Sequence, residues 1–289
     1  MTDLITSGWD EYRLLDSGQG RKLEKFGPYT VDRPEPQAMW NRRLPEKIWA
    51  EADAIFAGDN EAEDGRWNYR GKLPETWTTG YKGLRFTGRF TSFRHVGYFP
   101  EQAPHWDWMT ERIKGRDGFK LLNLFAYTGV ASLVAAKAGA HVTHVDASKK
   151  AIGWASDNQK TAGLEEAKIR WICEDARKFT AREGRRGNKY QGILIDPPKF
   201  GRGPDKELWE LFDDLKGMLE LCSDVLDDDK SFVVLTAYAI RASHHALYEL
   251  CREVFGKGKV ATIDSGELVI AEENNGRKIS TSLFCRLER

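Results

Sequence analysis

The chain has 289 residues, enough for two domains of ordinary size. Hydrophobic residues make up 40% of it and charged residues 30%, a balance that allows a packed core and excludes a largely disordered protein. Because 44 Lys and Arg balance 44 Asp and Glu, the net charge is zero, which excludes a globally basic nucleic-acid-binding protein but not a local basic face.

Residues 1–95 predict a small β-rich domain. Residues 12–15 and 23–26 are extended segments on either side of a Ser-Gly-Gln-Gly turn, which predicts a hairpin. Residues 45–57 have helical spacing, and residues 66–93 resemble two or three strands. We expect this domain to take part in substrate or RNA recognition.

Two segments concentrate positive charge. Residues 66–94 hold seven basic residues, one acid and seven aromatic residues, and residues 177–202 hold eight basic residues and two acids. Bases interleaved with aromatics suit a phosphate backbone and unstacked bases, which makes Arg85, Arg89 and Arg94 candidate substrate contacts. The alternative is a sheet with one packed aromatic face and one solvated cationic face.

The pattern changes after residue 110, where apolar strands alternate with helices. Strands are expected at residues 120–125, 141–146, 168–173, 190–198, 231–237, 260–270 and 279–287, and helices at residues 128–139, 148–163 and 243–255, from residue 176, and from about residue 205. Alternating strands and helices indicate parallel βαβ units. Residues 96–289 therefore predict an α/β, Rossmann-like domain with a seven-stranded, mostly parallel sheet.

The expected location and the expected lack of metal rest on patterns that the sequence does not contain. The four cysteines have no paired spacing, which argues against zinc or disulfides and favours a reducing, cytoplasmic location. The first residues lack the pattern of a signal peptide, no apolar run approaches 18 residues, and no His, Asp or Glu cluster has ligand spacing. We expect no membrane and no metal partner, while the oligomeric state is left open.

Acidic residues follow successive predicted strands: Asp146, Asp175 and Asp196. In an open parallel sheet the ligand lies beyond the carboxyl ends of the strands. Asp146 can accept hydrogen bonds from both hydroxyls of a ribose, and Asp175 one from an adenine amino group. An isolated acid at such a place is usually a helix N-cap, but Ser148 could cap the helix after Asp146 and leave that carboxylate to the ligand.

The first loop indicates which adenosine compound binds. A dinucleotide-binding fold needs a G-x-G-x-x-G turn for its pyrophosphate, whereas here only Gly129 lies in the turn, and there is no Walker loop. An adenosine ligand without phosphate fits better, and S-adenosylmethionine is the obvious one.

The motifs NLFAYTG (123–129), VDAS…A (145–151), EDA (174–176) and DPPKF (196–200) resemble those of class I S-adenosylmethionine-dependent methyltransferases of the large-subunit ribosomal RNA type. The resemblance covers residues 97–289 and includes GYFPEQ (97–102). It implies the class I methyltransferase fold and a set of cofactor contacts. These are Gln102, Asn123, Phe125, Tyr127, Thr128, Gly129, Asp146, Ala147, Ser148, Asp175, Ala176 and Asp196.

The Asp196-Pro197-Pro198 corner is the candidate catalytic site, together with Phe200. Two prolines stiffen the backbone and remove two N–H donors, so the corner offers acceptors, which suit a nitrogen that gains positive charge as it is methylated. Phe200 could stack on the base, Lys199 could contact a phosphate or a base oxygen, and Tyr238 could line the pocket. A rigid loop without chemistry is the alternative.

Carbon-5 methylation of cytosine, as in many relatives, requires a cysteine after the fourth or fifth strand. The sequence has Pro197-Pro198 and Thr236-Ala237 there, and all four cysteines are expected to be packed thiols. The leading hypothesis is methylation of a base nitrogen in ribosomal RNA. The alternatives are methylation of a protein side-chain amide or a small amine, a 5-methylcytosine enzyme, and a non-catalytic adenosine-binding module.

Overall fold

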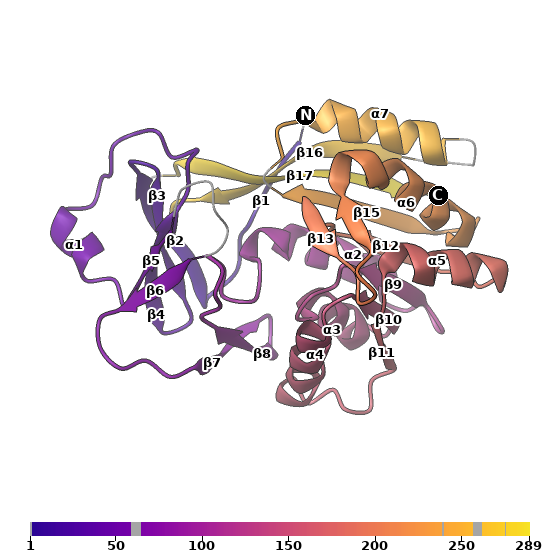
Figure 1. Ribbon diagram of the computed structural model, residues 1–289, viewed down its shortest axis with the longest axis horizontal. Helices are drawn as coiled ribbons and strands as arrows, with labels where there is room; N and C mark the ends of the chain where they lie inside the picture. Colours follow the sequence, from indigo (N-terminus) through magenta and orange to yellow (C-terminus); the bar gives the residue numbers. More distant parts are fainter. Residues whose placement is uncertain (1, 59–64, 239, 257–261, 275) are drawn as a thin grey trace. The chain divides into compact units, whose positions relative to one another are not determined.

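The computed structural model describes residues 2–58, 65–238, 240–256, 262–274 and 276–289 (Figure 1). The chain forms two compact units. Unit 1 comprises Met1–Leu4, Pro104–Leu268 and Thr281–Arg289, and unit 2 comprises Ile5–Ala103 and Val269–Ser280. This division falls after residue 103 rather than at the expected residue 95, places Met1–Leu4 in unit 1, and adds the segment 269–280 to unit 2. Arg277, for example, donates a hydrogen bond to the carbonyl of Ser17 at 2.8 Å.

An eight-stranded sheet in the order β1-β16-β17-β15-β12-β9-β10-β11 forms the framework of unit 1. The strands are β1 (Thr2–Ile5), β9 (Lys120–Leu124), β10 (His141–Asp146), β11 (Ile169–Cys173), β12 (Gly192–Ile195), β15 (Phe232–Tyr238), β16 (Thr262–Ala271) and β17 (Lys278–Glu288). Neighbours from β11 to β15 run parallel, and β17 is antiparallel to β15. The mostly parallel α/β sheet is confirmed. Its eighth strand, β1, was not predicted, and residue 260, where we expected the sixth predicted strand to start, lies outside the described residues.

Helices cover the sheet on both faces (Figure 1). They are α2 (Ala103–Ile113), α3 (Val130–Lys137), α4 (Lys149–Thr161), α5 (Ala176–Arg185), α6 (Leu211–Val225) and α7 (His244–Phe255). Helix α6 packs between α5 and α7, and α3 packs against α4. The core beneath α5–α7 joins strand residues such as Ile193 and Val233 to Phe179 and Met218 of the helices. This packing fixes the strand ends that carry the candidate site.

The predicted helix from about residue 205 is wrong in its first part. Residues 200–210 form a two-stranded ribbon, β13 (Phe200–Arg202) with β14 (Leu208–Glu210), and α6 begins only at Leu211. Trp209 lies opposite Gly201 in this ribbon and is 5% exposed. The space above glycine accepts the large indole, so burial of Trp209 outweighs the helical propensity of the charged residues around it.

Unit 2 contains a five-stranded sheet in the order β2-β3-β4-β5-β6 and a two-stranded sheet of β7 and β8. The elements are β2 (Tyr12–Gly18), β3 (Arg21–Phe26), β4 (Tyr29–Pro34), α1 (Glu46–Ala50), β5 (Ala54–Ala57), β6 (Arg66–Tyr69), β7 (Thr76–Tyr81), β8 (Leu84–Arg89) and the short 3₁₀ helix η1 (Pro100–Gln102). The β-rich character and the hairpin are as expected. The helical segment is shorter than expected, because Ala54–Ala57 pairs with β6 as a strand.

A buried ionic network lies within unit 2. Arg33 donates to both carboxylate oxygens of Glu24, and the Tyr12 hydroxyl donates to Glu24 at 2.7 Å. Lys22 pairs with Glu35 at 3.1 Å. Such buried charges are tolerated only because each has a partner.

Candidate active site

The loop after β9 has an unusual backbone. Phe125 and Tyr127 have φ values of +56° and +49°, and Gly129 has +84°. Non-glycine residues with positive φ cost free energy and concentrate at ligand sites. A Cβ on Gly129 would meet the Cβ of Ala155 at 2.9 Å, so the loop runs close against α4. This shape suits a ligand that lies directly on the backbone.

A side chain that the sequence did not single out supports the loop. Asn158 is fully buried on α4 and donates from Nδ2 to the carbonyl oxygen of Thr128 at 3.0 Å. Thr128 is itself buried. The only hint in the sequence was an amide on the face of α4 that also carries Ala151 and Ala155, both of which are buried.

Asp146 joins the ends of β9 and β10. Its Oδ2 accepts the backbone N–H of Tyr127 and its Oδ1 that of Ser148, both at 2.8 Å. Ser148 in turn caps α4 by accepting the N–H of Ala151 at 3.2 Å. Burial raises the pKa of Asp146, and the two backbone N–H groups oppose this rise. Each carboxylate oxygen has two lone pairs, so Asp146 can still accept both hydroxyls of a ribose.

Asp175 serves as the N-cap of α5. It accepts the N–H of Lys178 at 3.0 Å, and its second oxygen lies 3.7 Å from Arg177. Ala176 is the first residue of α5 and is buried. The cap uses only one carboxylate oxygen of Asp175. This geometry therefore also permits the predicted contact with adenine.

The Asp196-Pro197-Pro198 corner directly follows β12. The Asp196 N–H donates to the carbonyl of Leu124 at 3.4 Å, which ties the corner to the end of β9. The Trp209 indole donates to the Pro198 carbonyl at 2.7 Å, and its ring lies 4.8 Å from that of Phe125. Trp209 was missed from the sequence because it falls within the segment that we expected to be helical.

The structure brings most predicted residues of unit 1 to one edge of the sheet. The end segments are Phe125–Gly129, Asp146–Ser148, Asp175–Ala176, Asp196–Phe200 and Tyr238, which closes β15. Asn123 differs. It is 3% exposed and donates to Ser132 Oγ at 2.9 Å, and Ser132 contacts buried His144 at 3.0 Å. Its side chain belongs to the core because it lies within β9 rather than beyond it.

The other predicted residues belong to unit 2. Gln102 ends η1. Arg85 pairs with Glu11, Arg89 lies 3.7 Å from Glu75, and the Arg94 carbonyl accepts from Arg33 at 3.1 Å. Trp67 and Trp77 of the same segment are buried. Tyr81 and Phe86 are buried as well, whereas Tyr69 and Phe93 are exposed, so most but not all aromatic residues of this segment supply packing, as its alternative interpretation expected.

Half of the eight basic residues in the second basic segment are paired with acids of unit 1. Arg177 pairs with Asp214 at 2.6 Å, Arg182 with Glu174, Lys178 with Asp205 and Glu207, and Arg186 with Glu183. The ring of Phe200 is 60% exposed, and the Lys199 amine lies 5.2 Å from its centre. Free positive charge is therefore smaller on α5 than the composition indicated.

One cysteine departs from the expectation. Cys222, Cys251 and Cys285 are buried, but Cys173 is exposed at the end of β11, with its thiol 3.6 Å from the Ala147 carbonyl. The prediction of four packed thiols is wrong for Cys173. The packing environment differs there because this residue ends an outermost strand of the sheet.

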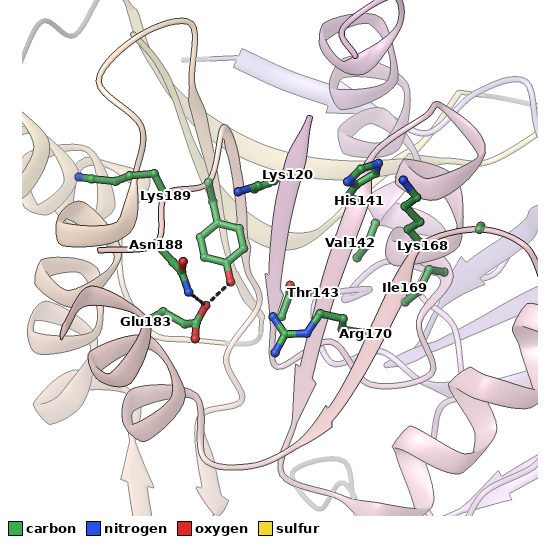
Figure 2. Close-up of a pocket in the computed structure, with 12 residues that line it drawn as sticks. Lys120, His141, Val142, Thr143, Lys168, Ile169, Arg170, Glu183, Asn188 and Lys189 are labelled. Carbon is green, nitrogen blue, oxygen red and sulfur yellow. Dashed lines mark hydrogen bonds between the residues drawn. The ribbon is translucent and has the colours of Figure 1, made fainter. Parts of the chain in front are cut away.

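A polar pocket of about 410 Å³ lies at the opposite edge, where β9, β10 and β11 begin (Figure 2). Glu183 forms its buried floor and accepts from the Tyr190 hydroxyl and from Asn188 Nδ2, both at 2.8 Å. Burial raises the pKa of Tyr190 to about 12. Because this pocket is at the amino ends of the strands, it is separate from the candidate active site.

No group of three or more His, Cys, Asp or Glu side chains within the described ranges could hold a metal ion. In the same part of the chain, every helix is too short or too polar to span a membrane.

A family model described as S-adenosylmethionine-dependent methyltransferase matches residues 60–254. Ribosomal RNA large subunit methyltransferase K/L of Shewanella loihica is 32% identical over 207 residues, which make up 68% of this chain and 28% of that protein. The Shewanella baltica protein of the same name is 30% identical over 242 residues, 76% of this chain and 32% of its own length. The chain thus spans less than a third of the length of these curated relatives.

Solved structures agree with this family. The crystal structure of a SAM dependent methyltransferase from Agrobacterium tumefaciens is 54% identical, with a TM-score of 0.95, and the match covers 100% of this chain and 93% of that one. The tRNA m1G37 methyltransferase of M. jannaschii shares the fold, with a TM-score of 0.56 at 14% identity over 89% of this chain and 69% of that one. The strained loop, the strand-end carboxylates and the absence of a phosphate-binding turn fit the same cofactor. The chain belongs to the S-adenosylmethionine-dependent methyltransferase family.

Proposed function

We propose that this methyltransferase modifies a base nitrogen in ribosomal RNA, with the Asp196-Pro197-Pro198 corner as the reacting site. The observation that carries the proposal is the position of this corner. It follows β12 at the strand end next to β9, whose loop has the backbone suited to the cofactor. Relatives named ribosomal RNA methyltransferases support the substrate class.

The proposed cofactor contacts lie at the same edge of the sheet, at the carboxyl ends of the parallel strands. Tyr127, Thr128 and Gly129 would hold S-adenosylmethionine from the loop, Asp146 would bind its ribose, and Asp175 would bind its adenine. When bound, S-adenosylmethionine supplies an activated methyl group. The chain's task is then to hold the acceptor nitrogen close and aligned, which alone is worth several kcal/mol of barrier.

The corner supplies acceptors rather than donors. Neither Pro197 nor Pro198 has an N–H, and the Pro198 carbonyl is already bound by Trp209. The Asp196 carboxylate and the Pro197 carbonyl would accept the N–H bonds of a substrate amino group and stabilise the positive charge that develops on it. Phe200, being exposed beside the corner, would stack on the base.

Methyl transfer to RNA tests the proposal. Wild type and Asp196→Ala are incubated with labelled S-adenosylmethionine and protein-free ribosomal RNA. We expect Asp196→Ala to lose turnover at least a hundredfold and to bind S-adenosylmethionine within about threefold of wild type, as measured by calorimetry. The variant Asp205→Ala, an exposed acid in the ribbon, is the control and should keep its turnover. Unchanged turnover in Asp196→Ala would refute the catalytic assignment.

The substrate class has a separate readout. The same labelled donor is offered to protein-free ribosomal RNA and to RNA-free protein extract. Label in the RNA supports the proposal. Label confined to protein or to small amines would overturn the RNA assignment and leave the cofactor site intact.

A further inference from the structure

The exposed large hydrophobic side chains of unit 1 gather in the segment that follows the Asp196-Pro197-Pro198 corner. Among the described residues of this unit, large hydrophobic side chains are exposed at only three positions: Phe200 at 60%, Leu208 at 68% and Phe212 at 59%. All three fall within residues 200–212, in the β13–β14 ribbon and the first turn of α6 (Figure 1). Leaving such groups in water is unfavourable, and a cluster of them indicates a binding surface.

The ribbon register places two of these side chains on one face. Phe200 pairs with Glu210 and Arg202 with Leu208, and directly opposed residues of an antiparallel pair share a face. The other face carries Gly201 and the buried Trp209. We call the first of these the outer ribbon face, and it consists of Phe200, Arg202, Leu208 and Glu210.

Several contacts hold the ribbon in place. The Trp209 indole donates to the Pro198 carbonyl at 2.7 Å, and the Leu211 N–H donates to the Lys199 carbonyl at 3.0 Å. The turn is closed by the Gly203 N–H, which donates to the Glu207 carbonyl at 2.8 Å. Lys178 of α5 pairs with Glu207. A surface held in this way loses little conformational entropy when it binds.

The charges of the ribbon differ from those of α5. Whereas Arg177, Lys178 and Arg182 are paired with acids, Lys199 and Arg202 form no ion pair with a carboxylate in the described part of the chain. The flat rings of Phe200 and Phe212, together with the apolar Leu208 and these two cations, match the two components of a single-stranded nucleic acid, bases and phosphates. Bases inside a duplex are stacked on each other and cannot reach such a surface.

We propose that the outer ribbon face, with Phe212, binds unpaired nucleotides of an RNA strand next to the target base. The inference rests on the proposed action on RNA and adds that the substrate is unpaired at the site of modification. Leu208 and Phe212 would contact neighbouring bases, and Arg202 would contact the phosphate between them.

Binding is measured by fluorescence anisotropy with a labelled uridine 12-mer and with a 12-base-pair RNA duplex, for wild type and the double variant Leu208→Ser/Phe212→Ser. The control is Met39→Ser, which removes an 86% exposed hydrophobic side chain from unit 2. Because all these side chains are exposed, the variants should keep the wild-type Tm. We expect the double variant to bind the 12-mer at least about fivefold more weakly, with duplex binding and S-adenosylmethionine affinity unchanged.

Each outcome decides one question. Equal affinity of the double variant and Met39→Ser for the 12-mer would overturn the ribbon proposal, as would a wild type that prefers the duplex. A wild type that binds the 12-mer through the ribbon but methylates only protein would refute the proposed function and the placement of the strand next to a target base, and would leave only the binding of unpaired RNA by the ribbon.

Discussion

Replacement of Gly129 by Ala tests why the loop after β9 has its shape and whether that shape serves the proposed cofactor binding. The left-handed conformation of this residue, φ +84°, costs about 1–2 kcal/mol for a residue with a Cβ. The new Cβ would also lie 2.9 Å from the Cβ of Ala155 and 3.4 Å from the Trp171 ring. A Cβ on a helix cannot rotate away, so crowding adds about 1–3 kcal/mol. The free energy of unfolding should fall by about 2–5 kcal/mol.

The matched control is Gly163→Ala. Gly163 has φ +64° but nothing within 4 Å of its would-be Cβ, so only the conformational cost applies. Urea unfolding gives both free energies, and calorimetry gives the affinity for S-adenosylmethionine. We expect Gly129→Ala to be the less stable variant and to bind the cofactor at least about tenfold more weakly, because relief of the clash moves the loop. Equal stability of the two variants with wild-type cofactor affinity would refute this reasoning.

Three further changes give separate predictions. Glu24→Gln should lower the free energy of unfolding by about 3–5 kcal/mol because it leaves Arg33 buried without its carboxylate. Burial raises the pKa of Glu24, but the charges of Arg33 and Lys22 and the hydrogen bonds from Arg33 and Tyr12 together outweigh burial and lower this pKa. The stabilisation present above the unfolded pKa should therefore be lost as the pH falls through the lowered folded value, and a wild-type unfolding series against pH checks this. Asp146→Asn should weaken S-adenosylmethionine binding about 10-fold or more in calorimetry. Burial raises the pKa of Asp146, so wild-type affinity should already decline on acidification at a pH above 3.8, and persistence of this decline in Asp146→Asn would contradict the assignment. Trp209→Phe frees the Pro198 carbonyl and should lower kcat about tenfold with little change in cofactor affinity; an unaltered kcat in steady-state assays would show that the indole does not position the corner.

Much of unit 1 could be predicted because its signals are local. Strand β10 coincides with the predicted residues 141–146, and α5 begins at the predicted Ala176. Strand-end acids were visible as Asp after an apolar run, and parallel pairing brings such ends to one edge. The positions of the loop after β9 and of the Asp196-Pro197-Pro198 corner at this edge could therefore be predicted from sequence, and their roles stay predictions.

The features that could not be predicted depend on contacts between residues that are not seen in any local sequence pattern. The ribbon depends on Trp209 finding the space above Gly201 and the carbonyl of Pro198, which no helical or strand period reveals. Likewise, Asn123 was expected to contact the cofactor because it opens the NLFAYTG motif, yet its side chain is buried within β9 and bonds to Ser132. Charge runs also misled, since composition cannot show that Arg177 faces Asp214.

The most direct test of the account is the identity of the methylated product. Protein-free ribosomal RNA is incubated with the wild-type protein and isotope-labelled S-adenosylmethionine, digested to nucleosides and analysed by mass spectrometry, with Asp196→Ala as the control. The account predicts a labelled base methylated on nitrogen that is missing from the control. Label on carbon 5 of cytosine, or a product of equal yield with Asp196→Ala, would contradict it.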